Sequence, residues 1–165
     1  MSTNRNNCIR ANRGFTLLIA IILATVALVV GLSLADVAYK QVILSSAARN
    51  SQAAFYRADS AMECALYWDQ RFAAFNVGSS FDQSAMECEG RDVVGYTESN
   101  IPGGGVRTIF DVTCAEGGIS ATVTVYKEGS QECAPDKKSC IFASGYNTCD
   151  VSNPNRFERG LKVKY

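Results

Sequence analysis

Residues 15–34, FTLLIAIILATVALVVGLSL, form an apolar run near the start of the chain and contain no charged residue. A helix of about twenty residues is about 30 Å long, which matches the hydrocarbon thickness of a bilayer. A secretory signal has a shorter apolar core followed by a small-residue cleavage site, whereas this run continues into helix-compatible sequence at residues 35–41. The run therefore predicts a membrane-spanning helix that is retained.

The charges that flank this run predict its orientation. All three charges in the first fourteen residues are positive (Arg5, Arg10 and Arg13), and Asp36 is the first charge after the run. Because positive flanks remain on the cytoplasmic side of a membrane, the N-terminus is expected in the cytoplasm. The chain is then a single-pass protein of the cytoplasmic membrane with its C-terminal body outside.

The composition argues against several classes of function. A chain of 165 residues has room for one ordinary domain plus one extended element. Without the first fourteen residues, thirteen basic residues face sixteen acidic ones, so no nucleic-acid binding is expected. The chain has no histidine, which removes the commonest general base and transition-metal ligand. We expect no enzyme activity, no cofactor, no metal and no small-molecule substrate.

Six of the seven cysteines are expected to form disulfides. Cys8 lies in the basic N-terminal segment, and an even number lies beyond it. Such a set, in a domain that leaves the cytosol, indicates a disulfide framework of up to three bridges whose pairing the sequence does not resolve. The candidates are Cys64, Cys88, Cys114, Cys133, Cys140 and Cys149.

Two bridges can be suggested from position. Cys133 and Cys140 flank a turn, ECAPDKKSC, where a bridge could tie two strands at low strain. Cys64 lies late in a predicted helix, and a bond to Cys88 or Cys149 would attach that helix to the body and stabilise it by about 2 to 4 kcal/mol. A metal site is disfavoured because the cysteines lack paired CxxC spacing.

The junction Arg13-Gly14-Phe15-Thr16-Leu17-Leu18 resembles the cleavage site of type IV prepilins, where a short basic leader ends in glycine and the apolar helix begins with phenylalanine. The resemblance implies that prepilin peptidase removes residues 1–14 by cutting between Gly14 and Phe15 and then methylates the new amino group of Phe15. A glycine would admit the protease to an extended scissile bond. Loss of the three arginines would free the apolar end to move from the bilayer into a filament.

One position departs from that family pattern. The fifth residue after the expected cut is Ile19, where most pilins have a glutamate that neutralises the N-terminal amine of a neighbouring subunit. Because a buried ammonium without a carboxylate is costly, a minor subunit that primes, caps or decorates a filament is expected. PilX-like minor pilins and the tip-forming minor pseudopilin of type II secretion also commonly lack this acid.

The resemblance also implies partners and a location. The N-terminal helix would pack against other pilin subunits, prepilin peptidase would process the precursor, and the membrane would hold the chain before assembly. The subunit would then lie in a cell-surface or periplasmic filament. Pilus, secretion and DNA-uptake machines share this anchor chemistry, so the choice among them stays open.

Residues 37–72 predict an extended amphipathic helix. Residues 36–71 lack proline and glycine and are rich in alanine. This stretch also resembles the segment that follows the anchor in PilX-like minor pilins. The spacing predicts that one apolar face packs on a sheet and that charged residues such as Asp69 mostly face elsewhere. The residues of that face are Ala54, Phe55, Ala58, Ala61, Met62, Ala65 and Leu66.

Residues 73–165 predict a disulfide-bonded antiparallel sheet of about four strands. Glycine-rich turns separate short β-prone runs, and residues 106–114 and 119–127 alternate around a turn as in a hairpin. Residues 139–145 and 158–165 predict two further strands, and residues 92–96 a possible fifth. With the transmembrane or filament-core helix at 15–36, the expected class is α+β and pilin-like, one long helix packed on a sheet.

Two other functions remain open. The first is a membrane-anchored extracytoplasmic binding module that does not assemble. The second is an anchored hydrolase that uses Asp, Glu or Ser, although the carboxylates show no recognisable pairing. A calcium loop is a minor hypothesis for the oxygen-bearing side chains of Asp150, Asn153, Asn155 and Glu158, whose spacing matches no twelve-residue calcium loop.

Overall fold

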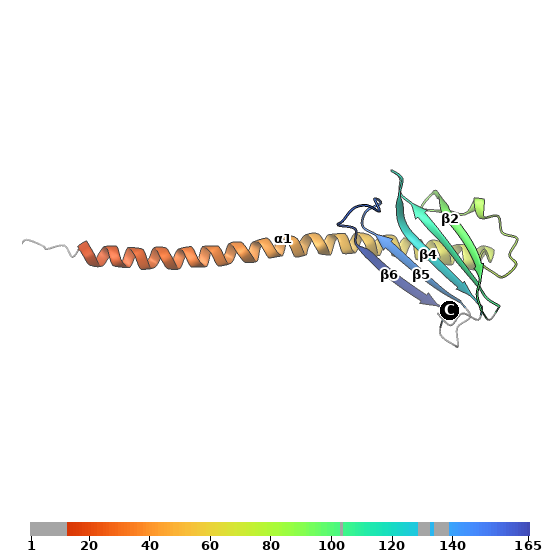
Figure 1. Ribbon diagram of the computed structural model, residues 1–165, viewed down its shortest axis with the longest axis horizontal. Helices are drawn as coiled ribbons and strands as arrows, with labels where there is room; N and C mark the ends of the chain where they lie inside the picture. The colour runs from red at the N-terminus through yellow and green to blue at the C-terminus, as the bar shows by residue number, and fades with distance from the viewer. Residues whose placement is uncertain (1–12, 103, 129–132, 134–138) are drawn as a thin grey trace, which may run out of the picture. The chain divides into compact units, whose positions relative to one another are not determined.

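The computed structural model describes residues 13–102, 104–128, 133 and 139–165, with backbone alone for residues 13 and 14. The chain groups into two compact units, residues 1–45 and 46–165, and helix α1 (Arg13–Phe72) runs through both. The second unit adds a short 3₁₀ helix, η1 (Gln83–Ala85), and a six-stranded sheet. Figure 1 shows α1 and the strands in chain order. The predicted α+β class is confirmed.

Helix α1 is continuous over 60 residues. Its length follows from the sequence, because the interior lacks proline and its single glycine, Gly31, is tolerated in an apolar helix. The helix ends at Phe72, and the next residue, Ala73, adopts a left-handed φ of 51°. The Ala73 and Ala74 amides then donate to the carbonyls of Asp69 and Trp68 at 3.0 and 3.3 Å, which satisfies acceptors in the last turn.

The sheet is an antiparallel meander in which every strand pairs with its neighbours in sequence. Its strands are β1 (Glu87–Cys88), β2 (Arg91–Asn100), β3 (Val106–Thr113), β4 (Ile119–Lys127), β5 (Ser139–Tyr146) and β6 (Glu158–Lys164).

The strands predicted at 106–114, 119–127, 139–145 and 158–165 are confirmed, and the possible fifth at 92–96 lies within β2. The predicted total of about four is slightly low, because β1 was not predicted. β1 has two residues, too few for a period-two pattern, and β2 is mostly exposed, so neither carries a clear apolar alternation. A register shift between Val94 and Thr97 interrupts the alternation in β2 further.

The second half of α1 packs on one face of the sheet through small side chains. Ala54, Ala58, Ala61 and Ala65 are buried. Gly145 of β5 has no Cβ, and a Cβ there would overlap the backbone of Ala54 and Ala58. The helix and β5 therefore touch backbone to backbone, and only glycine fits at position 145 without a shift.

The core lies between α1 and the inner face of the sheet. Its sheet side is formed by Phe110, Val112, Ala121, Val123, Val125, Ile141 and Ala143. Phe75, which follows α1, stacks on Phe110 with ring centroids 5.8 Å apart. Of the predicted helix face, Phe55 is the exception, because it remains 44% exposed. It lies one residue beyond Ala54, about 100° around the helix from the buried stripe.

Candidate functional site

The apolar run of α1 is exposed along its whole length. Every residue from Phe15 to Ser46 is exposed, and Phe15 itself is 66% accessible. Contiguous apolar patches above a few hundred Å² are rare on soluble monomers and mark contact with lipid or protein. By length and composition, α1 is the one helix in the described part of the chain that could cross a membrane. A single-pass anchor is consistent with this surface.

Polar side chains within the run are satisfied by the helix itself. The Thr25 hydroxyl donates to the Ile22 carbonyl at 2.8 Å, and the Ser33 hydroxyl donates to the Val29 carbonyl at 2.9 Å. In hydrocarbon an unpaired hydroxyl is costly, and such back-bonding avoids that cost. These two residues are therefore compatible with a lipid or an apolar protein environment.

The first charged residues after the run pair with each other. Lys40 Nζ lies 2.7 Å from Asp36 Oδ2, one helical turn away, and both side chains are exposed. An exposed pair of this kind contributes only a few tenths of a kcal/mol to helix stability. Asp36 therefore lies at the end of the apolar run, where a membrane-spanning segment would be expected to meet water.

The predicted processing site lies at the start of α1. The helix begins at Arg13, so the Gly14–Phe15 peptide bond lies in its first turn, which contains no acidic residue. The first N–H groups of a helix lack intrahelical acceptors, and helix ends open at low free energy. A protease that needs an extended substrate would meet this bond at the part of the helix that unwinds most easily.

The six candidate cysteines form three disulfides. Cys64 bonds to Cys88, Cys114 to Cys149 and Cys133 to Cys140, with Cα–Cα distances of 5.7, 6.2 and 5.6 Å. Of the two partners considered for Cys64, the structure has Cys88, so the bond joins α1 to β1. Cys149 instead joins the segment after β5 to the turn after β3.

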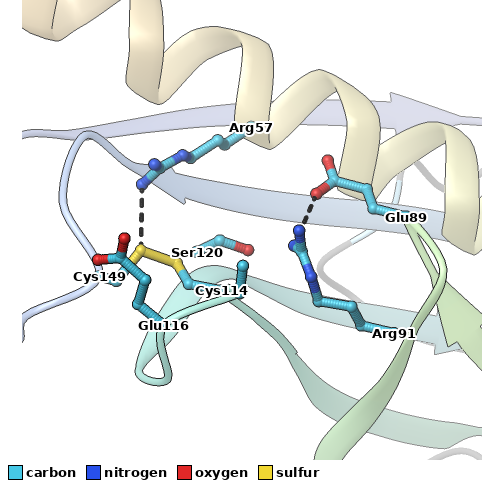
Figure 2. A pocket seen from close by; sticks show the side chains of 8 residues that line it. Arg57, Glu89, Arg91, Cys114, Glu116, Ser120 and Cys149 are labelled. Atoms are coloured by element: carbon cyan, nitrogen blue, oxygen red, sulfur yellow. Dashed lines mark hydrogen bonds and ion pairs between the residues drawn. A yellow bond between two sulfur atoms is a disulfide. The ribbon is translucent and has the colours of Figure 1, made fainter.

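A pocket of about 390 Å³ opens beside the Cys114–Cys149 disulfide (Figure 2). It collects side chains from α1, from the β1–β2 turn and the start of β2, from the β3–β4 turn and the start of β4, and from the segment after β5. Its charges are balanced, with two arginines and two glutamates. The lining residues are Arg57, Glu89, Arg91, Cys114, Ala115, Glu116, Ser120 and Cys149.

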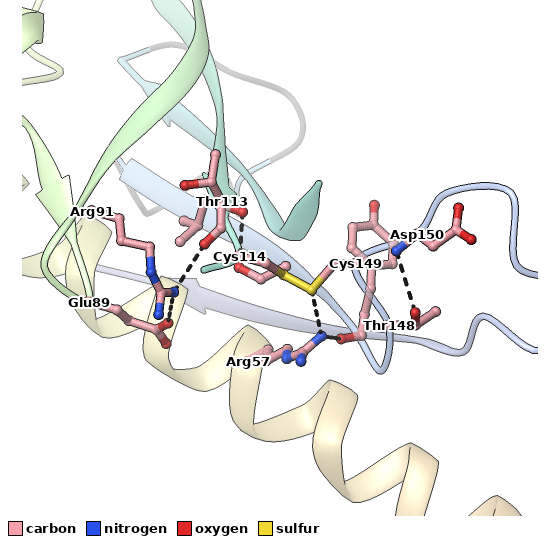
Figure 3. Close-up of a disulfide and its surroundings, with 11 residues drawn as sticks. Arg57, Glu89, Arg91, Thr113, Cys114, Thr148, Cys149 and Asp150 are labelled. Carbon is pink, nitrogen blue, oxygen red and sulfur yellow. Dashed lines mark hydrogen bonds and ion pairs between the residues drawn. A yellow bond between two sulfur atoms is a disulfide. The ribbon is translucent and has the colours of Figure 1, made fainter. Parts of the chain in front are cut away.

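The two arginines of the pocket have different partners (Figure 3). Arg57 Nη1 donates to the Tyr146 carbonyl at 2.8 Å and lies 3.7 Å from Cys149 Sγ. Arg91 Nη1 donates to the Thr113 carbonyl at 3.2 Å and lies 3.6 Å from a Glu89 carboxylate oxygen. Of the two arginines, only Arg57 contacts a sulfur atom of the Cys114–Cys149 bridge.

No family model, curated protein or solved structure matches this chain. The residues singled out from sequence fall into two groups. Gly14 and Phe15 belong to the unit 1–45, whereas all six bridged cysteines belong to the unit 46–165. The structure gathers the cysteines in pairs, and the pocket contains one of these pairs. Cys8 lies outside the described residues.

One cluster escaped the sequence analysis. Asp69 was expected to face away from the sheet but is 6% exposed, because it meets Lys127 of β4, which is 9% exposed. Lys127 Nζ donates to Asp69 Oδ2 at 2.5 Å, and the Tyr165 hydroxyl donates to the same oxygen. Burial raises the pKa of Tyr165, and the Asp69 carboxylate raises it further. The pairing spans 58 positions, so no local pattern could indicate it.

The oxygen-bearing loop considered for calcium uses several of its oxygens in turns. Asp150 Oδ1 accepts from the Ser152 amide at 2.8 Å and from its hydroxyl at 2.6 Å, and these bonds hold the pKa of Asp150 below its usual value. Asn153 Oδ1 accepts from the Asn155 amide at 2.9 Å. Within the described residues, no group of three or more acidic, cysteine or histidine side chains is arranged to hold a metal.

Proposed function

We propose that this chain is a minor subunit that primes, caps or decorates a type IV pilus-like or type II secretion filament after processing by prepilin peptidase. The observation that carries the proposal is the exposed apolar surface of α1, which begins one residue after the glycine of a prepilin-like junction. Transfer of one large apolar side chain out of water is worth about 1.5 to 3 kcal/mol. A run of this length therefore needs a bilayer before assembly and neighbouring helices after it.

Ile19 supports the minor role. After cleavage, the Phe15 amine would lie four residues from an aliphatic side chain, and the first acid would be Asp36. An amine buried in a helical bundle needs a carboxylate, which must then come from another subunit. A subunit placed once at a filament end meets this need with one partner, whereas a repeated subunit must meet it at every copy.

The first test is the mature N-terminus. The full chain is produced with a prepilin peptidase, extracted from membranes in detergent and sequenced from its N-terminus. We expect a chain that starts at methylated Phe15. Gly14→Leu should leave the precursor uncut, because a bulky side chain blocks the extended scissile bond.

Gly31→Leu is the matched control. Gly31 lies in the same helix with nothing within 4 Å of an added Cβ, so this variant should mature normally. Normal maturation of the Gly14→Leu variant would refute processing at this junction, as would a wild-type chain that still begins at Met1 beside an active peptidase.

The pocket favours a second candidate, an anchored extracytoplasmic binding module that never assembles. Its 390 Å³ volume is within the range of small-ligand sites, and charged side chains of both signs line it. Under this alternative the helix only tethers the body, so the chain would keep residues 1–14. The same N-terminal sequencing separates the two candidates.

A further inference from the structure

The three disulfides differ in access to solvent. The Cys64–Cys88 bridge contains the fully buried Cys88, and both Cys133 and Cys140 are buried. In the Cys114–Cys149 bridge both residues are partly exposed, and both line the pocket. Cys64 is partly exposed too, so this bridge differs from the others in that neither of its cysteines is buried. Because both of its cysteines open onto the pocket, this bridge is the one of the three that a thiol in solution is expected to reach first.

The same bridge has an asymmetric electrostatic environment. Arg57 Nη1 lies 3.7 Å from Cys149 Sγ, and a second bond, to the Tyr146 carbonyl at 2.8 Å, fixes the guanidinium in place (Figure 3). A fixed cation stabilises a thiolate. Because exchange is faster when the departing sulfur is the better stabilised thiolate, Cys149 is the favoured leaving group and Cys114 the favoured point of attack.

We propose that Cys114–Cys149 is a thiol–disulfide exchange site whose partner is the dithiol of an extracytoplasmic oxidoreductase. The attacking thiolate forms a bond to Cys114 Sγ, the Cys114–Cys149 bond breaks, and its electron pair leaves on Cys149 Sγ beside Arg57. The second thiol of the partner then displaces Cys114. In total, two electrons and two protons pass from the dithiol, which becomes a disulfide, to Cys114 and Cys149, which become thiols.

The position of the bridge gives the exchange a structural result. The bond ties the β3–β4 turn to the segment after β5, and Gly118 of that turn lies against the Cys149 carbonyl, where a Cβ would overlap it. Reduction releases this one link. The ladder between β3 and β4 and that between β4 and β5 stay paired through their backbone hydrogen bonds.

The direct test is the regiochemistry of a trapped mixed disulfide. The full chain in detergent carries Cys8→Ser, so that all six remaining cysteines are bridged. It is treated briefly with limiting glutathione, quenched in acid, alkylated and mapped by peptide mass spectrometry. We expect glutathione on Cys114 and the alkyl label on Cys149, with the other two bridges intact. Glutathione mainly on Cys149, or another bridge opening first, would overturn the proposal.

Variants of the two pocket arginines test the role of the cation. Arg57→Gln should slow exchange at this bridge about tenfold, the usual worth of a charge-assisted hydrogen bond. Arg91→Gln is the matched control, because Arg91 lines the same pocket but bonds to the Thr113 carbonyl and Glu89. Its exchange rate should stay near that of the wild type.

An unchanged rate in Arg57→Gln, or an equal loss in both variants, would refute the role of Arg57. The other two bridges report on folding in the same sample, because they gain label if the body loosens. If the Arg57→Gln body does loosen, Arg57→Lys provides the test, because it keeps the charge. Its rate of exchange at Cys114–Cys149 should be within a few fold of the wild-type rate. Failure of Arg57→Lys to do so, with its other bridges intact, would also count against the proposal.

Discussion

Asp69 and Lys127 form an ion pair between α1 and β4 in a nearly dry environment. Two charges removed from water each lose several kcal/mol of hydration, which only a close partner offsets. Tyr165 supplies a further hydrogen bond to the shared carboxylate oxygen. The pair therefore fixes which helical turn faces β4 more than it adds to net stability.

Removal of one member of this pair should be strongly destabilising. Asp69→Ala leaves the Lys127 ammonium buried without its partner, and we expect a loss of about 3 kcal/mol in the free energy of unfolding. Denaturant unfolding of the detergent-solubilised chain measures it. Asp59→Ala, which removes an exposed acid from the same helix, should change stability by about 0.5 kcal/mol or less. Equal losses of stability in Asp69→Ala and Asp59→Ala would show that Asp69 is not part of a buried ion pair. The double variant Asp69→Ala with Lys127→Met should recover part of the lost stability, because it also removes the unpaired ammonium.

Tyr165 should make stability sensitive to alkaline pH. Burial and the bond to Asp69 raise its pKa above the ordinary value of 10.0 in the folded state, so the folded chain holds this proton more tightly than the unfolded chain. The resulting stability is complete below about pH 10 and is lost as the pH rises above that value. Tyr165→Phe removes this proton, so its free energy of unfolding should fall less steeply than that of the wild type between about pH 9 and pH 11.

The matched control for this titration is Tyr67→Phe. Tyr67 is an exposed tyrosine of α1, so this variant shows the effect of removing a tyrosine hydroxyl elsewhere on the chain. If the free energy of unfolding fell equally steeply with pH in the wild type and in Tyr165→Phe, Tyr165 would bind its proton equally tightly in the folded and unfolded states.

At the scale of elements, the contact between α1 and β5 depends on the absence of a side chain. Gly145→Ala places a methyl group into the backbone of Ala54 and Ala58, and over-packing of this kind costs about 1 to 3 kcal/mol. Thermal unfolding in detergent measures the loss. Gly160→Ala in β6 is the control, because its new Cβ would meet only Ser144 Oγ, at 4.0 Å. Similar unfolding temperatures for the two variants would show that the helix has room to shift.

Element type followed from sequence wherever a residue pattern was long. The helix and strands β3 to β6 have sustained periodicity or composition, so local physics predicts them. β1 and most of β2 lie at the sheet edge, where exposed faces remove the alternation. Phe55 was assigned to the packed face because its spacing resembled that of its neighbours, but a stripe of alanines is narrow and excludes the adjacent ring.

At the scale of the whole chain, the sequence separated the apolar helix from the cysteine-bearing body but left most of the site unassigned. Composition and parity indicated six bridged cysteines, whereas the Cys114–Cys149 pairing depends on a sheet register that brings residues 35 positions apart together. The pocket likewise forms only when the fold brings together residues that lie far apart in the sequence. Arg57 gave no signal in the sequence because its role arises only when Cys149 lies beside it.

The strand order β1-β2-β3-β4-β5-β6 has a consequence for how the body forms. No strand waits for a distant segment, since each one docks on the strand made just before it, and such nearest-neighbour topologies reach the native state quickly. Without β6, the chain would expose the edge of β5 and would leave Asp69 without its bond to Tyr165.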